Sequence, residues 1–250
     1  MQKTINRILK SSNDRIEFCI ELINDLKLKN IAEIGVYRGD FAKEVLKKSQ
    51  SITHYIMVDP WRNLAAWNKP WNKNDDTFNV YYQETLDKTE FAKEKIQVLR
   101  GMTTEVIDQI KDESCDLVYV DGDHTLKGIT IDLINLWPKV KSNGFILGDD
   151  FSPTIWQHNN KYEPTLIFPF AIYFAEAVNT KIYGLPFNQF LISKAQSGFE
   201  FIDMTDGDYR DVGLNNQFQN RPIYKKRSKL RTIIKNNVPF ASKIYYALKG

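Results

Sequence analysis

Short runs of β-branched and aromatic residues alternate with segments of helical spacing along most of the chain. This alternation is typical of βα units stacked on a parallel sheet, and it predicts a doubly wound α/β fold. Seven strands are expected, at residues 30–36, 52–58, 96–99, 115–120, 144–147, 181–185 and 188–193. Residues 199–201 are a further candidate for extending the sheet.

Helical spacing fills most of the intervals between these strands. Before the first strand, Ile16, Ile20 and Ile23 recur at helical spacing behind Ser12 and Asn13 as caps, so residues 1–29 are expected to supply a covering helix. Further helices are expected at 40–48, 78–95, 103–111 and 170–178, with one more that ends at Pro138.

The composition is that of one large globular domain: 250 residues, 42% hydrophobic and 26% charged. Mean hydropathy is −0.42, and no apolar run approaches the length of a membrane span. Residues 1–10 lack the apolar segment of a secretory signal, so the mature chain is expected to begin at Met1. Cys19 and Cys115 form neither a disulfide framework nor a metal motif, which favours the cytoplasm.

Charge is distributed unevenly. Residues 221–250 hold nine Lys and Arg and no Asp or Glu, which leaves residues 1–220 with a net charge of −6. This body has no general nucleic-acid signature, so no nucleic-acid partner is expected. We therefore predict a domain over residues 1–220 and a basic tail over residues 221–250.

The basic tail carries apolar residues at helical spacing. They are Leu230, Ile233, Ile234, Ile244, Tyr245 and Leu248. A basic amphipathic helix fits an anionic membrane surface, here the inner face, or an anionic glycan carrier. The alternative is a solvated helix, or one that packs against another subunit of a homo-oligomer.

Candidate ligand-binding residues follow the first two strands, because ligands of open α/β sheets bind beyond the carboxyl ends of the strands. Gly35 and Gly39 follow the first strand and allow a ligand to approach the backbone. Glu33 precedes them, where a cationic ligand group could use it. Asp59 ends the second strand, where its carboxylate could bind ribose hydroxyls; the alternative is a solvated carboxylate.

Three carboxylates end the fourth and fifth predicted strands: Asp121, Asp149 and Asp150. Carboxylates that converge repel one another unless a cation neutralises them. Oxygen ligands suit a hard cation, so the pattern indicates Mg²⁺, with Ca²⁺ or Mn²⁺ as alternatives. The competing interpretation is a pair of polar turns.

His124 stands three residues after Asp121, within reach of the same cleft. An imidazole is suited to take a proton from an alcohol at neutral pH, which makes His124 a candidate general base. The alternatives are a helix-start histidine bonded to Asp123 and a direct metal ligand. His158, together with Trp156, is a candidate for contact with the substrate.

These motifs resemble the class I S-adenosylmethionine-dependent methyltransferases over residues 30–195. The segment E-I-G-V-Y-R-G is similar to the cofactor loop, and V-D-P to the ribose-binding acid. The pairing of V-D-G-D-H with G-D-D-F resembles in particular the metal-dependent O-methyltransferases of macrolide sugars, and more distantly the catechol and caffeoyl-coenzyme A enzymes. Tyr37 departs from the family pattern, which has a glycine there.

The resemblance implies a Rossmann-like, mostly parallel seven-stranded sheet whose last strand is antiparallel. It also implies a cofactor, S-adenosylmethionine, with Gly35, Tyr37 and Gly39 near its methionine portion. Asp59 would bind the ribose, and Gly101 and Met102 would lie along the adenine. Asp121, beside the cofactor, would hold Mg²⁺ together with Asp149 and Asp150, and His124 would be the base.

The Trp-rich loop, residues 60–76, carries Trp61, Trp67 and Trp71 amid four asparagines. Amphipathic aromatic rings stack on sugars or flat rings, and amides bind hydroxyls, so this loop is expected to cover the substrate. The alternative is an aromatic plug against the sheet edge or another subunit.

The function favoured by these features is Mg²⁺-dependent methyl transfer to a hydroxyl of a sugar, glycan or sugar-bearing metabolite. An aliphatic hydroxyl is far less acidic than a phenol, and a dedicated base such as His124 serves it better. Two alternatives remain. One is transfer to a small phenol or catechol, and the other is a non-catalytic scaffold whose basic tail binds an anionic surface.

Overall fold

The residues that the structure describes are built on one eight-stranded sheet in the order β3-β2-β1-β4-β5-β7-β6-β8. We describe the computed structural model over residues 1–158, 161–195 and 198–209. The strands are β1 (Asn30–Ile34), β2 (His54–Asp59), β3 (Ile96–Arg100), β4 (Cys115–Val120), β5 (Val140–Gly148), β6 (Lys181–Leu185), β7 (Gln189–Ser193) and β8 (Glu200–Asp203). Strands β1 to β5 are parallel, and the order reverses between β1 and β4.

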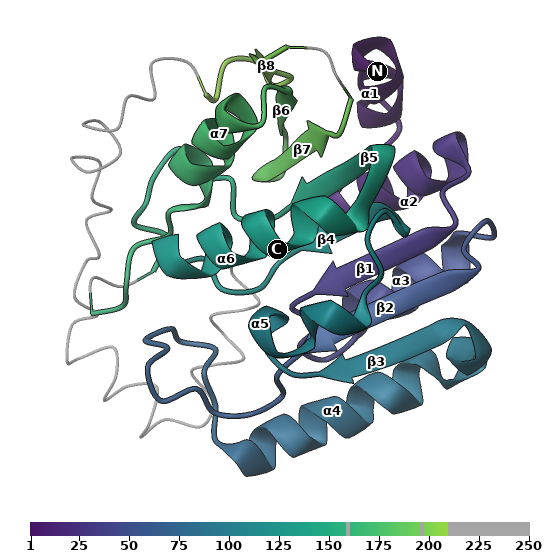
Figure 1. The fold of residues 1–250 in the computed structure, drawn as a ribbon, viewed down its shortest axis with the longest axis vertical. Coiled ribbons are helices and arrows are strands. Elements are labelled where there is room, and N and C mark those ends of the chain that lie inside the picture. The colour runs from purple at the N-terminus through teal and green to yellow at the C-terminus, as the bar shows by residue number, and fades with distance from the viewer. Residues whose placement is uncertain (159–160, 196–197, 210–250) are drawn as a thin grey trace, which may run out of the picture. The chain divides into compact units, whose positions relative to one another are not determined.

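Helices cover both faces of the sheet (Figure 1). They are α1 (Gln2–Leu9), α2 (Arg15–Leu26), α3 (Asp40–Lys48), α4 (Asp75–Thr89), α5 (Thr103–Val106), α6 (Leu126–Leu136) and α7 (Ile167–Ala177). Short 3₁₀ turns occupy Glu90–Lys95, Ile107–Gln109 and Trp137–Lys139. Helices α1 to α4 contribute to one core, and α5 to α7 to the other.

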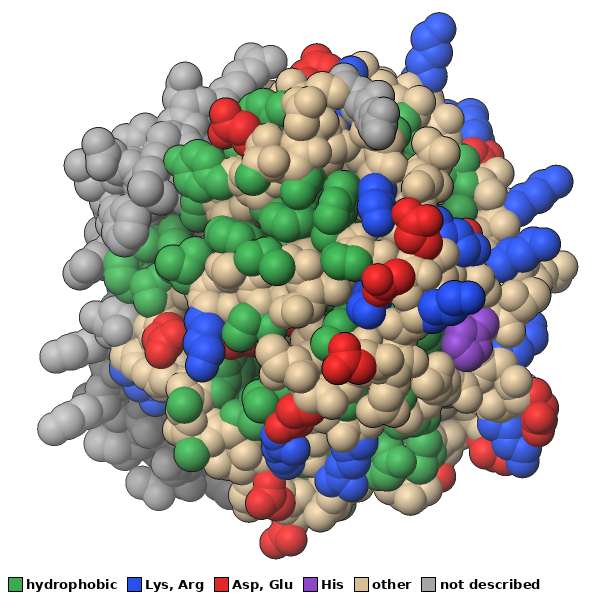
Figure 2. Space-filling model, in the orientation of Figure 1, with side chains coloured by type: hydrophobic (Ala, Val, Ile, Leu, Met, Phe, Trp, Pro, Cys, Tyr) green, Lys and Arg blue, Asp and Glu red, His purple; other side chains and the backbone are tan. Residues whose placement is uncertain are grey.

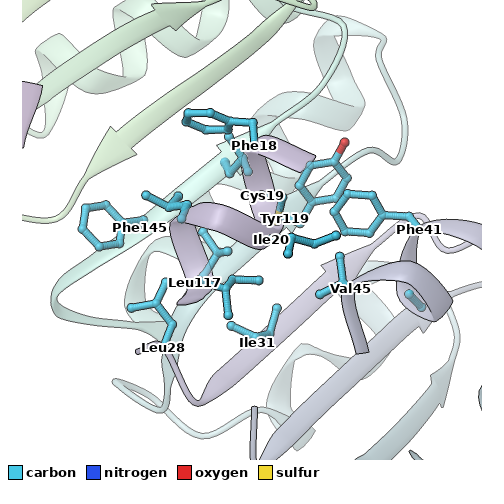
Figure 3. Packing of buried hydrophobic residues seen from close by; sticks show 14 of the residues in the cluster. Phe18, Cys19, Ile20, Leu28, Ile31, Phe41, Val45, Leu117, Tyr119 and Phe145 are labelled. Atoms are coloured by element: carbon cyan, nitrogen blue, oxygen red, sulfur yellow. The ribbon is translucent and has the colours of Figure 1, made fainter. Parts of the chain in front are cut away.

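The central strands are buried on both faces, as parallel strands between two helical layers must be. In β4, Leu117 and Tyr119 enter the core beneath α2 and α3, whereas Val118 and Val120 enter the opposite core. The ring of Phe41, from α3, stacks on Tyr119 with 4.0 Å between ring centroids (Figure 3). The sheet therefore offers a rigid base for the loops at its carboxyl end.

Helix α2 starts at a well-formed cap. The side chain of Asp14 accepts hydrogen bonds from the amides of Ile16 and Glu17, which satisfies two otherwise unpaired donors. Phe18 and Leu22 lie on the inner side of the helix and are buried in the core. The position of Arg15, the first helical residue, is fixed as a result.

The predicted fold class is confirmed, including the antiparallel strand: β7 runs antiparallel to both β5 and β6. The candidate extension at residues 199–201 is present as β8, which pairs with β6 and makes the sheet eight-stranded instead of seven-stranded. One helix goes beyond the prediction: α1 precedes the expected covering helix. The sequence pattern is weak at both places, because β8 is only half-buried and α1 is a short helix at the terminus.

Part of the molecular surface is apolar. Figure 2 shows the molecule in the orientation of Figure 1, and hydrophobic side chains gather on this face where α6 and α7 lie. Exposed members on these helices are Leu126, Ile134 and Tyr173. The expectation of a homo-oligomer stays a prediction.

Within the described residues, no helix has the length and apolar character needed to cross a membrane. The basic tail, residues 221–250, lies outside the described residues. Its proposed contact with an anionic membrane or glycan carrier stays a prediction, as does the cytoplasmic location.

Candidate active site

A cavity of about 730 Å³ opens at the carboxyl end of the sheet, where the strand order reverses between β1 and β4. Loops that follow all five parallel strands contribute to its lining, among them Gly35, Asp59, Gly101, Asp121 and Asp149. This is the position at which open α/β sheets bind ligands. The three predicted metal residues and most of the predicted cofactor residues therefore meet in one cavity.

Gly35 allows the loops after β1 and β4 to touch. Its φ of +89° is in the region that favours glycine, and a Cβ atom there would lie 2.1 Å from the carbonyl oxygen of Asp121. Any side chain at this position would thus clash with backbone, and the loops would have to separate.

Tyr37 occupies the position where the family pattern has a glycine, and it adopts a glycine-like backbone with φ of 54°. Its amide donates to Oδ2 of Asp59 at 2.9 Å, and its ring meets that of Trp71 edge-on, with 6.0 Å between centroids. Tyr37 and Trp71 both line the cavity. The departure from the family pattern thus brings an aromatic wall to this loop.

Asp59 organises the turn between β2 and the Trp-rich loop. Besides the Tyr37 amide, its carboxylate accepts a 2.7 Å hydrogen bond from the amide of Trp61. Burial raises the pKa of Asp59, although these backbone hydrogen bonds oppose the rise. A carboxylate oxygen has two lone pairs, so Asp59 keeps capacity for ligand hydroxyls on the cavity side.

The loop after β3 forms another part of the cavity wall. Gly101 and Met102 line it as expected, and so does Asp132 of α6, which the sequence analysis missed. Asp132 is buried and accepts a 2.6 Å hydrogen bond from the hydroxyl of Thr103. Burial raises its pKa to about 7. The sequence signal that could have revealed Asp132 is a charged residue on the otherwise apolar, buried side of α6.

The acidic cluster, Asp121, Asp149 and Asp150, lines the same cavity. Nε2 of His124 lies 3.3 Å from Oδ1 of Asp121, and its Nδ1 contacts Oδ2 of Asp150. Among the described residues Nε2 has no hydrogen-bond partner, although it is buried. His124 was predicted to lie within reach of this cleft, and it lies between two of the three carboxylates.

His124 holds a proton tightly in this arrangement. Burial alone would lower its pKa, but the carboxylates of Asp121 and Asp150 outweigh burial and raise the pKa to about 10. The same interaction holds the pKa of Asp150 below its usual value, against the effect of burial. The imidazole therefore needs its surroundings neutralised before it can accept a proton near pH 7.

Arg15 is the second cation at the acidic cluster, and the sequence analysis did not identify it. Its Nη1 lies 3.1 Å from Oδ2 of Asp121 and also contacts Oδ2 of Asp149. The other oxygen of Asp149 accepts a 2.5 Å hydrogen bond from Nε2 of Gln189. No local pattern links a residue on α2 with the ends of β4 and β5.

The acidic cluster supplies oxygen atoms of the kind that a hard divalent cation prefers. In the described part of the chain, no set of three or more His, Cys, Asp and Glu side chains is arranged to hold a metal ion as it stands. However, the guanidinium of Arg15 already brings positive charge between Asp121 and Asp149. Three carboxylates that collect cations at one point are a suitable oxygen donor set for Mg²⁺.

Two residues expected at the cofactor lie elsewhere. The carboxyl of Glu33 is buried in the core under α2, where it accepts a 2.7 Å hydrogen bond from Tyr55, and burial raises its pKa to about 8. Gly39 caps α3, and a Cβ there would meet Thr85 of α4 at 2.9 Å. Neither Glu33 nor Gly39 is among the cavity-lining residues.

The Trp-rich loop divides into cavity-facing and buried tryptophans. Trp67 and Trp71 line the cavity, as does His158, whereas Trp61 is fully buried and donates from its indole to the Tyr37 carbonyl at 2.7 Å. Trp156 is not among the lining residues. The predicted substrate contacts of Trp61 and Trp156 thus lack support from the cavity.

The amides of the Trp-rich loop hold the loop together instead of facing the cavity. Asn72 donates to the carbonyls of Leu64 and Trp67 at 2.8 and 2.9 Å, and Asn74 caps α4. Lys69 donates to the carbonyl of Glu163 at 2.8 Å, which ties this loop to the segment before α7. The loop is therefore held in a folded form by its own amides, with Trp67 and Trp71 on the cavity side.

Comparison with known proteins agrees with this architecture. Residues 32–151 match the model of a family described as a methyltransferase domain. Over these residues the chain has a methyltransferase domain of the class I S-adenosylmethionine-dependent fold. The match covers the loops after β1 to β5, and the class predicted from the sequence is confirmed.

Solved structures show the same fold. An O-methyltransferase from Bacillus cereus in complex with S-adenosylhomocysteine (SAH) is 15% identical, with a TM-score of 0.53 over 76% of this chain and 90% of that one. A protein from Staphylococcus aureus described as a caffeoyl-CoA O-methyltransferase is 16% identical, with a TM-score of 0.54 over 77% and 90%. At these identities the likeness shows the shared fold alone.

A curated relative is much longer than this chain. The protein y4gI of Sinorhizobium fredii is 24% identical over 169 residues, which is 61% of this chain and 17% of the relative. The chain thus spans about a sixth of the curated relative it matches.

Proposed function

We propose that the protein is a Mg²⁺-dependent O-methyltransferase that moves the methyl group of S-adenosylmethionine to a hydroxyl of a sugar, glycan or sugar-bearing metabolite. One observation carries the proposal. The cofactor-type loops after β1, β2 and β3 open into the same cavity as three carboxylates and an imidazole. The similarity to O-methyltransferases of this fold supports it.

The cofactor would lie along the loops after β1 to β3. Gly35 lines the cavity where its methionine portion would lie, and Tyr37 would form a wall beside it. Asp59 would accept hydrogen bonds from the ribose hydroxyls, and Gly101 and Met102 would lie along the adenine. The sulfonium methyl is already electrophilic, so these residues mainly have to hold it in line with the acceptor oxygen.

His124 would take the proton of the acceptor hydroxyl. Once the neighbouring carboxylates are neutralised, Nδ1 would keep its proton, because it faces the carboxylate of Asp150, and Nε2 would be bare. Nε2 has no hydrogen-bond partner among the residues described, so it is available to the hydroxyl that receives the methyl group.

The acidic cluster would hold the metal ion. Asp121, Asp149 and Asp150 supply the oxygens, and Ca²⁺ or Mn²⁺ could replace Mg²⁺ in such a set. When bound, the ion would acidify the acceptor hydroxyl and lower the pKa of His124 by neutralising the carboxylates.

A sugar-like acceptor is favoured by the base and by the size of the cavity. At about 730 Å³ the cavity lies well within the range of ligand pockets that hold a drug-sized molecule. Trp67 and Trp71 offer aromatic surface for a sugar face, with His158 beside them. The polar contacts to the acceptor would come from Lys69 and His158 and not from the asparagines of the loop.

Transfer of labelled methyl groups to a panel of sugars, nucleotide sugars and catechols tests the proposal. We expect transfer to a sugar, loss of transfer in EDTA, recovery with Mg²⁺, and at least about a hundredfold loss in His124→Ala. Transfer that resists both EDTA and Asp149→Asn would refute the metal role. Transfer to catechols that tolerates His124→Ala would favour the phenol alternative, and a failure to bind S-adenosylmethionine would favour the scaffold.

A further inference from the structure

Arg15 reaches the acidic cluster from outside the segment that matches the methyltransferase family. It is the first residue of α2, whereas the matched segment begins at residue 32. Its guanidinium is the group that lies between the carboxylates of Asp121 and Asp149.

The oxygens that Arg15 contacts are those that a metal ion would need. Oδ1 of Asp149 already accepts a hydrogen bond from Gln189, so Oδ2, the oxygen beside Arg15, is the more available of the two for a ligand. In Asp121, Oδ1 lies beside His124 and Oδ2 beside Arg15. A guanidinium and a divalent ion therefore compete for the same two atoms.

Arg15 can leave these carboxylates without disturbing the fold. The Asp14 cap and the buried residues Phe18 and Leu22 hold the start of α2, so only the side chain has to move. That side chain is 37% exposed, against 11% for Asp149. A flexible arginine stem at the edge of the cavity can swing into solvent.

Arg15 also compensates charge that would otherwise be costly. Converging carboxylates destabilise one another when no cation is near, and Asp149 is mostly buried. A divalent ion would take over this compensation on binding. By linkage, each cation weakens the binding of the other.

We propose that Arg15 is a tethered cation that alternates with the divalent ion at Asp121 and Asp149 and thereby sets the affinity for that ion. The inference rests on the proposed function, because it assumes that the acidic cluster binds a metal ion. Arg15 balances the carboxylates until an ion displaces it, so the affinity is weaker than the three carboxylates alone would give.

Equilibrium binding of Mn²⁺, followed by the electron paramagnetic resonance of the free ion, tests this in the full-length protein. We expect Arg15→Gln to bind Mn²⁺ at least about tenfold more tightly than wild type, and Arg15→Lys to fall between them. Arg7→Gln is the matched control. Arg7 is on α1 and pairs at 2.6 Å with Asp25, which lies at the opposite end of α2 from Arg15. Its affinity should equal that of wild type.

A second readout is thermal unfolding. Arg15→Gln should lower the Tm in EDTA and lose most of that difference in saturating Mn²⁺, whereas Arg7→Gln should show the same difference in both. If Arg15→Gln does not fold, Arg15→Lys serves for both measurements.

The outcomes separate this inference from the proposed function. Wild type and Arg15→Gln binding Mn²⁺ equally, or weaker binding by Arg15→Gln, would overturn the inference and leave a metal site in place. An absence of Mn²⁺ binding in every variant would overturn both the inference and the metal role. Transfer insensitive to EDTA would refute the metal role alone.

Discussion

The two ends of the cavity are built by different means. At the cofactor end, backbone does most of the work: Gly35 touches the carbonyl of Asp121, and Asp59 is held by the amides of Tyr37 and Trp61. At the acidic end, side chains from distant elements meet through their charges, with Arg15 and His124 among three carboxylates.

This difference affects how each end responds to its ligand. A backbone cradle is rigid, so the cofactor end is already shaped before its ligand arrives. A charged cluster depends on which cations are present, so under the proposed function we expect the acidic end to change with metal concentration and pH. Substitutions that separate these two behaviours test the comparison.

The largest effect is expected at the rigid end, from Gly35→Ala. Its Cβ would overlap the Asp121 carbonyl, so we expect a loss of about 3 kcal/mol in the free energy of unfolding and no measurable SAH binding. Denaturant titration and calorimetry measure both.

Gly198→Ala is the matched control for Gly35→Ala. Gly198 has a similar φ of +75°, but no described atom lies within 4 Å of its Cβ position. It should lose only about 1 kcal/mol and bind SAH normally. Equal losses in the two variants would show that backbone strain, and not contact between the loops, dominates.

Glu33 should show a pH dependence that belongs to the core and not to the cofactor. Its folded pKa of about 8 exceeds the ordinary value of 4.5, so its contribution to stability is full below pH 4.5 and is lost as the pH rises towards 8. The free energy of unfolding of Glu33→Gln, relative to that of wild type, should therefore rise by on the order of 3 kcal/mol between pH 5 and pH 8.

Chemical unfolding at several pH values measures this gain, with SAH affinity as a second readout. The exposed Glu94→Gln is the control for the loss of a carboxyl group as such. A flat profile for Glu33→Gln, or a large loss of SAH binding, would return Glu33 to the cofactor site.

The smallest effect is expected in the Trp-rich loop. Trp67 donates from its indole to Oδ1 of Asp123 at 2.8 Å, and Asp123 also accepts from the Thr125 amide at the start of α6. Trp67→Phe should therefore cost about 1 kcal/mol of stability and raise KM for the acceptor, with SAH affinity unchanged.

Trp71→Phe provides the contrast, because Trp71 is 55% exposed. It should leave stability unchanged within about 0.5 kcal/mol. A stability loss as large as that of Trp67→Phe would show that the loop is anchored as a whole and not through the Trp67 contact.

The sequence was most informative where position along a strand decides the outcome. Asp59, Asp121, Asp149 and Asp150 end parallel strands, and the geometry of such sheets brings those ends together. The prediction that Glu33 lies at the cofactor was not supported. Strand β1 is buried on both faces, so strand periodicity cannot tell which core a residue enters. For Trp61, the turn after Pro60 directs the ring inward, which composition does not reveal.

The sequence did not reveal Arg15 either, and the reason is different. Its contacts join residues more than a hundred positions apart, and an arginine at a helix start normally faces solvent. The asparagines of the Trp-rich loop show the reverse error, because amides that suit a sugar also suit the backbone of their own loop.

A crystal structure with SAH and Mn²⁺, recorded at a wavelength where manganese scatters anomalously, tests the central claim most directly. We expect one anomalous peak held by oxygens of Asp121, Asp149 and Asp150, Arg15 turned away, and the SAH ribose on Asp59. SAH in place with no anomalous peak, and Arg15 still between Asp121 and Asp149 at saturating Mn²⁺, would contradict the account.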